Sequence, residues 1–220
     1  MIDWLRTQMF SVVETGGPVV AILLVLSTLS LAVILWKLWQ FTELGVGRQA
    51  RLRAALRHWD AGRVADARAL LAESRNQLAP NLLRALENGT GAKARIEAEV
   101  SAALERLEKA FRVLDSIAQI APLLGLFGTV LGMIDAFQAL QEAGDNVDPS
   151  LLAGGIWVAL LTTAAGLAVA IPTSVALTFF ESRVARERTL AETAIETIYC
   201  ALPDPVGAGA AADARTAHAT

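Results

Sequence analysis

Three long apolar segments constrain the fold of this chain more than any other feature of its sequence. The first runs from Pro18 to Trp36 and the third from Pro149 to Phe180, both without a charged residue. The second runs from Ile117 to Leu140 and contains one acid, Asp135. A helix needs about 20 apolar residues to cross the hydrocarbon core of a bilayer. The sequence therefore predicts an all-α integral membrane protein with three transmembrane helices.

The positions of Lys and Arg predict the orientation of these helices. Arg6 is the only basic residue before the first segment, whereas 13 follow Lys37 before the second segment begins. The connection between the second and third segments has none, and four follow the third. Basic residues are retained on the cytoplasmic side of membrane proteins. The N-terminus is therefore predicted to lie outside and the C-terminus in the cytoplasm.

Helix-breaking residues divide the chain further. Residues 1–14 alternate apolar and polar at helical spacing, which predicts a short amphipathic helix on the outer membrane surface, ended by Gly16, Gly17 and Pro18. The Ala-, Leu-, Arg- and Glu-rich insert after the first span favours short helices. The predicted segments are an N-terminal amphipathic segment (1–17), a first span (18–41), a cytoplasmic helical region (42–115), a second span (116–140), an outer loop (141–150), a third span (151–180), a cytoplasmic helix (181–204) and a disordered tail (205–220).

The second and third spans are both expected to project into the cytoplasm as continuous helices, the second from residue 92 onward and the third to about residue 198. An apolar stripe at helical spacing follows residues 92–115. It fits either a solvated helical bundle or packing between subunits, and helical spacing is the same in both cases.

The second and third apolar segments each carry a face of small residues. The faces comprise Gly125, Gly128 and Gly132 in the second segment, and Gly155, Ala159, Thr162, Thr163, Gly166, Ala170 and Thr173 in the third. Small residues let another helix backbone approach closely, which favours helix packing. The alternative is a polar lining beside a conduction path, in which hydroxyls and trapped waters pass protons. Pro122 and Pro172 lie inside these spans and predict helix kinks.

The segments APLLGLFGTVLGM, from Ala121, and GGIWVALLTTAAGLAVAIP, from Gly154, resemble the MotA/TolQ/ExbB family of proton-channel subunits, and within it the ExbB and TolQ branches. The resemblance implies a bacterial inner-membrane protein with a periplasmic N-terminus. It also implies five copies around a one-span ExbD- or TolR-like partner, whose membrane acid takes up protons. Proton flow would then energise a TonB- or TolA-like protein for outer-membrane transport or envelope integrity. The residues that match the family's pore-lining positions are Thr129 and Thr163.

One position departs from the family pattern. The family often has a glutamate in the third span, within a GIxEAL segment, and Val158 occupies that position here. A valine binds no proton. Either the partner supplies the only carboxylate that is needed, or this chain has altered conduction. The departure also keeps open a non-conducting structural scaffold as an alternative function.

Other classes of function have little support in the sequence. Cys200 is the only cysteine, and His58 and His218 are the only histidines, which argues against an intramolecular disulfide or a metal site. Basic residues alternate with acids, which argues against nucleic-acid binding. No nucleophile–base pair or phosphate-binding loop is present, so the sequence predicts neither an enzyme nor a bound cofactor.

Overall fold

The computed structural model describes residues 2–88, 90–143 and 149–200, and the side chains from Gly17 onward except at positions 90, 143, 149 and 151. These residues form helices and connecting turns, with no strand. The elements are α1 (Ile2–Glu43), α2 (Ala50–Asp60), α3 (Val64–Ala72), α4 (Ala79–Glu87), the 3₁₀ turn η1 (Thr90–Ala92), α5 (Lys93–Glu108), α6 (Phe111–Ala143) and α7 (Pro149–Cys200). Three helical stretches are long and apolar enough to cross a membrane. The predicted all-α membrane class with three spans is confirmed.

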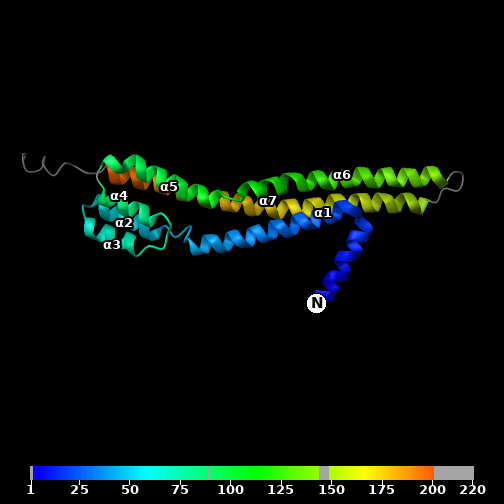
Figure 1. Ribbon diagram of the computed structural model, residues 1–220, viewed down its shortest axis with the longest axis horizontal. Helices are drawn as coiled ribbons and strands as arrows, with labels where there is room; N and C mark the ends of the chain where they lie inside the picture. Colours follow the sequence, from blue (N-terminus) through cyan, green and yellow to red (C-terminus); the bar gives the residue numbers. More distant parts are fainter. Residues whose placement is uncertain (1, 89, 144–148, 201–220) are drawn as a thin grey trace, which may run out of the picture. The chain divides into compact units, whose positions relative to one another are not determined.

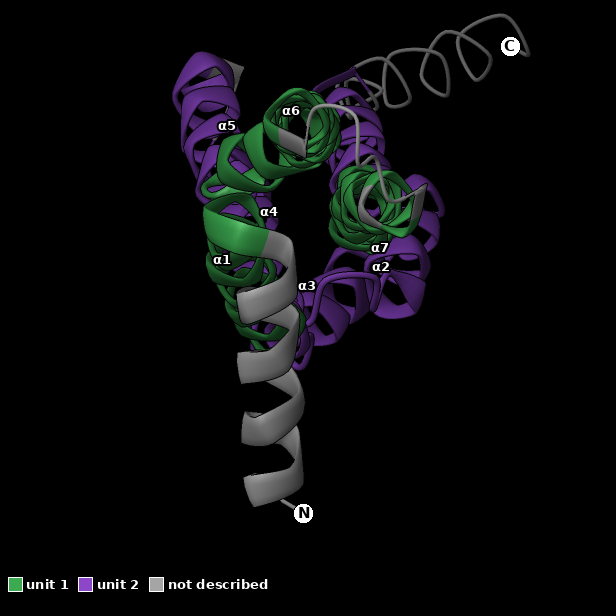
Figure 2. Ribbon diagram, turned by 90° about the vertical axis from the view of Figure 1, so that its right-hand side faces the viewer, with its two compact units in different colours: residues 1–39, 109–181 green, residues 40–108, 182–220 purple. Residues whose placement is uncertain are grey.

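The chain divides into two compact units (Figure 2). Unit 1 comprises residues 1–39 and 109–181, and unit 2 comprises residues 40–108 and 182–220. Unit 1 contains α6 with most of α1 and α7, whereas unit 2 contains α2 to α5 with the last part of α7. The apolar segments found in the sequence are therefore collected in unit 1.

A break in α1 lies at Gly17, where the backbone has φ 64° and ψ −163°. Only glycine adopts this conformation readily, and Pro18 follows it directly. The break lies within the Gly-Gly-Pro sequence that was expected to precede the first span. The side chains of the predicted amphipathic segment before Gly17 lie outside the described residues, as do residues 144–148 of the outer loop and the predicted tail.

In unit 1, the part of α1 that follows Gly17 runs alongside α6 and the unit 1 part of α7 (Figure 1). A small apolar cluster joins the three helices, with Val19 and Leu23 from α1, Ala121 from α6 and Ala170 from α7. The outward faces are also apolar, and their most exposed large side chains, at 64% to 67%, are Val25, Trp39, Leu123, Trp157 and Val175. Large exposed apolar surface on long helices is suited to lipid, in agreement with the three predicted spans.

A buried lysine lies near the end of the unit 1 part of α1. The Lys37 side chain is fully buried, with its ammonium nitrogen 4.8 Å from the ring centroid of Trp36 and 5.3 Å from that of Phe111. Phe111 in turn stacks on Phe180 with 6.2 Å between ring centroids. Aromatic faces stabilise a cation at these distances. These contacts join α1, the first residue of α6 and α7.

The expected continuous helix from residue 92 through the second span is wrong. α5 ends at Glu108, Ala110 has a left-handed φ of 71°, and α6 begins at Phe111. The backbone N–H groups of Val113 and Leu114 both donate to the Ala110 carbonyl oxygen, at 3.1 and 3.2 Å, and start the new helix. A left-handed alanine costs about 1–2 kcal/mol, so tertiary packing and not local propensity sets this break. By contrast, α7 does continue to Cys200 without a break, as expected for the third span.

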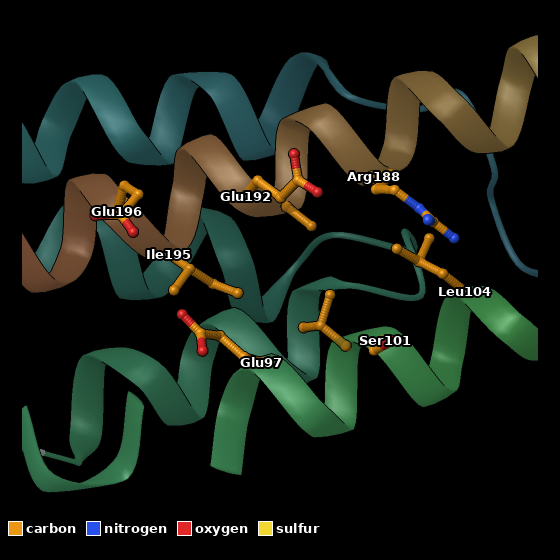
Figure 3. A pocket seen from close by; sticks show the side chains of 9 residues that line it. Glu97, Ser101, Leu104, Arg188, Glu192, Ile195 and Glu196 are labelled. Atoms are coloured by element: carbon orange, nitrogen blue, oxygen red, sulfur yellow. The ribbon is translucent and has the colours of Figure 1, made fainter. Parts of the chain in front are cut away.

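Unit 2 is a bundle in which α2 packs on α3, α3 on α4 and α4 on α5. A groove of about 300 Å³ lies between α5 and the last part of α7 (Figure 3). Its buried lining residues are apolar and include Leu104 and Ile195, whereas its rim carries charged side chains. Two ion pairs link the same helices, Lys93 with Glu196 and Arg188 with Glu108, each at 2.8 Å. An apolar floor with a charged rim is typical of a bundle that faces water.

Candidate functional site

The glycines of α6 and α7 lie against each other within one chain. A Cβ atom added to Gly166 would lie 2.5 Å from the carbonyl oxygen of Ala121 and 3.1 Å from the Cα of Gly125. One added to Gly125 would lie 2.9 Å from the carbonyl oxygen of Thr162. At these two glycines the neighbouring atoms belong to the backbone, so the two helices are in direct main-chain contact.

The contact continues along the two helices through other small residues. A Cβ on Gly132 would lie 3.2 Å from the Cβ of Ala159, and one on Gly155 would lie 2.5 Å from the Cβ of Ala136. The small faces noted in the sequence therefore meet each other. Gly154, which immediately precedes this stripe, has no heavy atom within 4 Å of an added Cβ and lies outside the contact.

Thr162 is the hydroxyl residue at the centre of this contact. Its side chain is 2% exposed, and its Oγ1 lies 2.7 Å from the Ala159 carbonyl oxygen and 3.2 Å from that of Gly125. A Cβ on Gly128 would come within 2.6 Å of the same Oγ1. Thr162 therefore fills the space that Gly128 leaves open.

Thr163 and Thr129, the two predicted path residues, are only partly buried. The Thr163 hydroxyl donates to the Gly125 carbonyl oxygen at 3.2 Å, and the Thr129 hydroxyl donates to the Leu126 carbonyl oxygen at 2.6 Å. In an α-helix the N–H of residue 129 donates to the carbonyl of residue 125. The structure thus brings the Thr163 hydroxyl to the same carbonyl that the Thr129 backbone uses.

The remaining predicted positions lie along the same two helices. Val158 is half-buried in α7, in the turn that precedes Thr162 and Thr163, and Asp135 is exposed on α6. Both helices continue through their prolines, Pro122 and Pro172. A kink at either proline stays a prediction.

The burial of Thr162 at the centre of the contact was not predicted. The sequence places Thr162 and Thr163 together in the small-residue stripe and assigns the path to Thr163, an assignment that stays a prediction. The signal was available, because Thr162 follows Gly155 and Ala159 by seven and three residues and precedes Gly166 by four. That spacing places all four residues on one helix face.

Metal chemistry has no site in the part of the chain that the structure describes. Within it, no group of three or more His, Cys, Asp and Glu side chains is placed to hold a metal ion. The chemical groups that this interface offers are therefore hydroxyls and backbone carbonyls. A hydroxyl both donates and accepts, so it can pass a proton along hydrogen bonds without a fixed charge, whereas a carbonyl oxygen only accepts.

An all-α, multi-span membrane protein, with two spans held together by glycine and threonine, is the class that the fold and the site define. Within that class, the chain belongs to the MotA/TolQ/ExbB proton channel family, whose family model matches residues 66–193, more than half of the chain. The predicted resemblance is confirmed.

Individual relatives carry ExbB and TolQ names. The chain is 36% identical over 163 residues to the putative biopolymer transport protein ExbB-like 1 of Synechocystis, which covers 71% of this chain and 64% of that protein. It is 49% identical over 61 residues to the biopolymer transport protein exbB1 of Vibrio cholerae, covering 28% of this chain and 27% of that protein. It is 41% identical over 81 residues to the Tol-Pal system protein TolQ of Haemophilus influenzae, covering 37% and 35%. The matches span less than two thirds of the length of each of these relatives.

These findings define the chain as an ExbB/TolQ-like subunit of a proton channel family and as a multi-pass inner-membrane protein. The family is a channel family and not a class of enzymes.

Proposed function

We propose that this chain is a subunit of an inner-membrane motor driven by the proton motive force. Five copies surround the single span of an ExbD- or TolR-like partner, and proton flow through the complex energises a TonB- or TolA-like protein. The N-terminus is periplasmic, and residues 42–115 and 181–220 are cytoplasmic. The relatives' names support the ExbB/TolQ character of the subunit, and the distribution of Lys and Arg supports the orientation.

The observation that carries the proposal is the difference between two adjacent threonines. Thr162 is buried in the α6–α7 contact, where backbone atoms lie too close to admit a water molecule. Thr163 is only partly buried and holds one weak hydrogen bond to the Gly125 carbonyl oxygen. The path therefore runs beside the α6–α7 pair and not through it. Thr163 and Thr129 supply hydroxyls on the side where a partner helix binds.

Val158 makes the path drier in the turn that precedes these threonines. A buried acid in a membrane helix costs on the order of 3 kcal/mol on insertion scales, unless it is neutral or solvated. With valine at this position, the partner's carboxylate is the only acid that needs to bind protons. This arrangement separates proton binding, on the partner, from proton relay, on this chain.

The test is proton flux into liposomes that contain the complex with its partner. Thr163→Val should reduce flux at least tenfold and leave assembly intact, because valine and threonine are nearly isosteric. The matched control is Thr162→Val, which removes a hydroxyl one residue away that lies in the packed contact. It should change stability more than flux. Native flux from Thr163→Val would contradict the role of this hydroxyl.

A second substitution tests Val158 and the alternative function. Val158→Glu should keep or raise flux if the path passes this residue, whereas a loss of flux would place residue 158 in packing. Val158 is also the observation that favours a non-conducting scaffold. A scaffold would co-purify with a one-span partner yet conduct no protons in either the native protein or Val158→Glu.

A further inference from the structure

The loop between α1 and α2 is held by a buried carboxylate. Glu187, from the last part of α7, is fully buried within unit 2. Its Oε1 accepts hydrogen bonds from the backbone N–H of Gly47, at 2.7 Å, and from the side-chain amide of Gln49, at 3.0 Å. Its Oε2 accepts one from the side-chain amide of Asn76, at 2.9 Å. Hydrogen bonds to a carboxylate are strong, so the loop has a fixed conformation.

The first turn of α2 has no side-chain cap. Gln49 is the N-cap residue, but its amide nitrogen donates to Glu187 and its oxygen accepts from Arg53 at 2.6 Å. No side chain caps the helix, and its first turn contains no acid. The N–H groups of a first helical turn have no partner within the helix and attract anions.

A cleft of about 680 Å³ lies at this helix end and is lined by three arginines, Arg48, Arg51 and Arg75. Arg51 lies 3.9 Å from the Glu73 carboxylate, which is the only acid in the lining. Arg48 and Arg75 are exposed, and neither forms an ion pair in the described part of the chain. The cleft therefore presents unpaired guanidinium groups.

The cleft lies close in sequence to the end of the first span. The apolar part of α1, Gly17–Glu43, has 27 residues, and at 1.5 Å per residue it is about 40 Å long. That length covers the hydrocarbon core of about 30 Å and extends into the headgroups. Arg48 follows Glu43 by five residues, a reach of at most about 17 Å. A headgroup phosphate at the membrane surface is within that reach.

We propose that this cleft binds a phosphate group, namely that of an anionic phospholipid headgroup in the cytoplasmic leaflet. The location rests on the orientation proposed above, whereas the binding chemistry does not. Guanidinium groups match the geometry of phosphate oxygens, and the open helix end adds backbone donors. Anionic lipids are concentrated in the cytoplasmic leaflet. Glu187 supports the site, because its hydrogen bonds to Gly47 and Gln49 fix the loop that carries Arg48.

The experiment uses the full chain, purified in detergent, depleted of lipid and titrated with phosphatidylglycerol under native mass spectrometry. Arg48→Gln and Arg75→Gln should each weaken binding about fivefold, the change expected for one arginine near an anionic headgroup. Arg57→Gln is the matched control, because Arg57 is exposed on α2 and does not line the cleft. Its affinity should equal that of the native chain.

Two further probes define the ligand. Phosphatidylcholine should bind more weakly than phosphatidylglycerol, since its headgroup has no net charge. Inorganic phosphate should compete only weakly; competition as strong as that of the lipid would keep the phosphate site and assign it to a soluble phosphate. Equal phosphatidylglycerol affinity in the native chain and in both cleft variants would overturn the proposal. Proton flux is not measured, so this result is independent of the motor proposal.

Discussion

The contact between α6 and α7 can be tested by adding one carbon atom, in Gly166→Ala. The new Cβ would lie 2.5 Å from the Ala121 carbonyl oxygen and 3.2 Å from the Gly125 backbone nitrogen. Backbone atoms have no alternative rotamer, so the helices have to separate by about 1 Å to relieve the overlap. The same separation lengthens the hydrogen bond from Thr163 to Gly125, which is already 3.2 Å.

The size of the effect follows from a matched control, Gly154→Ala. Both substitutions gain the helix propensity of alanine, about 1 kcal/mol, but an added Cβ at Gly154 meets no atom within 4 Å. The propensity term cancels between the two variants. Their difference in the free energy of unfolding is the overpacking cost, about 1–3 kcal/mol.

The assay is unfolding by SDS in mixed micelles, followed by tryptophan fluorescence. Gly166→Ala should unfold at a lower SDS fraction than Gly154→Ala. Identical unfolding midpoints for the two variants would refute the direct backbone contact between α6 and α7.

Three other predictions concern other parts of the chain. Ala110→Gly should stabilise the protein by about 1 kcal/mol, because glycine adopts the left-handed conformation without the alanine penalty, and Ala110→Val should destabilise it; SDS unfolding measures both. Glu187→Gln should lower the free energy of unfolding by about 2–3 kcal/mol, because the new amide nitrogen would face backbone or amide donors. The control Glu192→Gln changes an exposed side chain of the same helix and should lower it by less than about 0.5 kcal/mol. In a background without the native cysteine, periplasmic labelling of introduced cysteines should reach residues 141–150 and miss residues 48–112; the reverse pattern would overturn the proposed orientation.

Hydropathy was sufficient to predict the three spans, because a bilayer imposes a length and a composition that few other environments require. The small faces were equally visible, since the spacing of Gly125, Gly128 and Gly132 is a property of the helix alone. Which neighbour each face meets is a tertiary property. Adjacent residues on a helix are about 100° apart, so Thr162 and Thr163 meet the contact differently. Both hydroxyls reach the Gly125 carbonyl oxygen, but only Thr162 is buried, and only the pairing of the two helices shows this difference.

Two features were beyond sequence reasoning for a different reason. The break at Ala110 has no Gly or Pro to signal it, because packing overrides the helical preference of the local sequence. Glu187 looks like one of several charges on the predicted cytoplasmic helix. Its burial depends on Asn76, 111 residues away, and on the loop at Gly47 and Gln49. Neither local propensity nor helical spacing carries that information.

The α6–α7 contact also has a consequence for how related sequences can diverge. At Gly128 the close neighbours are side-chain atoms of Thr162, the Oγ1 at 2.6 Å and the Cβ at 2.7 Å. A larger residue at 128 can therefore be accommodated by a smaller one at 162, so these positions can change together and a suppressor of Gly128→Ala should arise at 162. At Gly125 and Gly166 the obstructing atoms belong to the main chain, which no substitution can shorten. Positions 128 and 162 can therefore diverge together among related sequences, whereas positions 125 and 166 cannot.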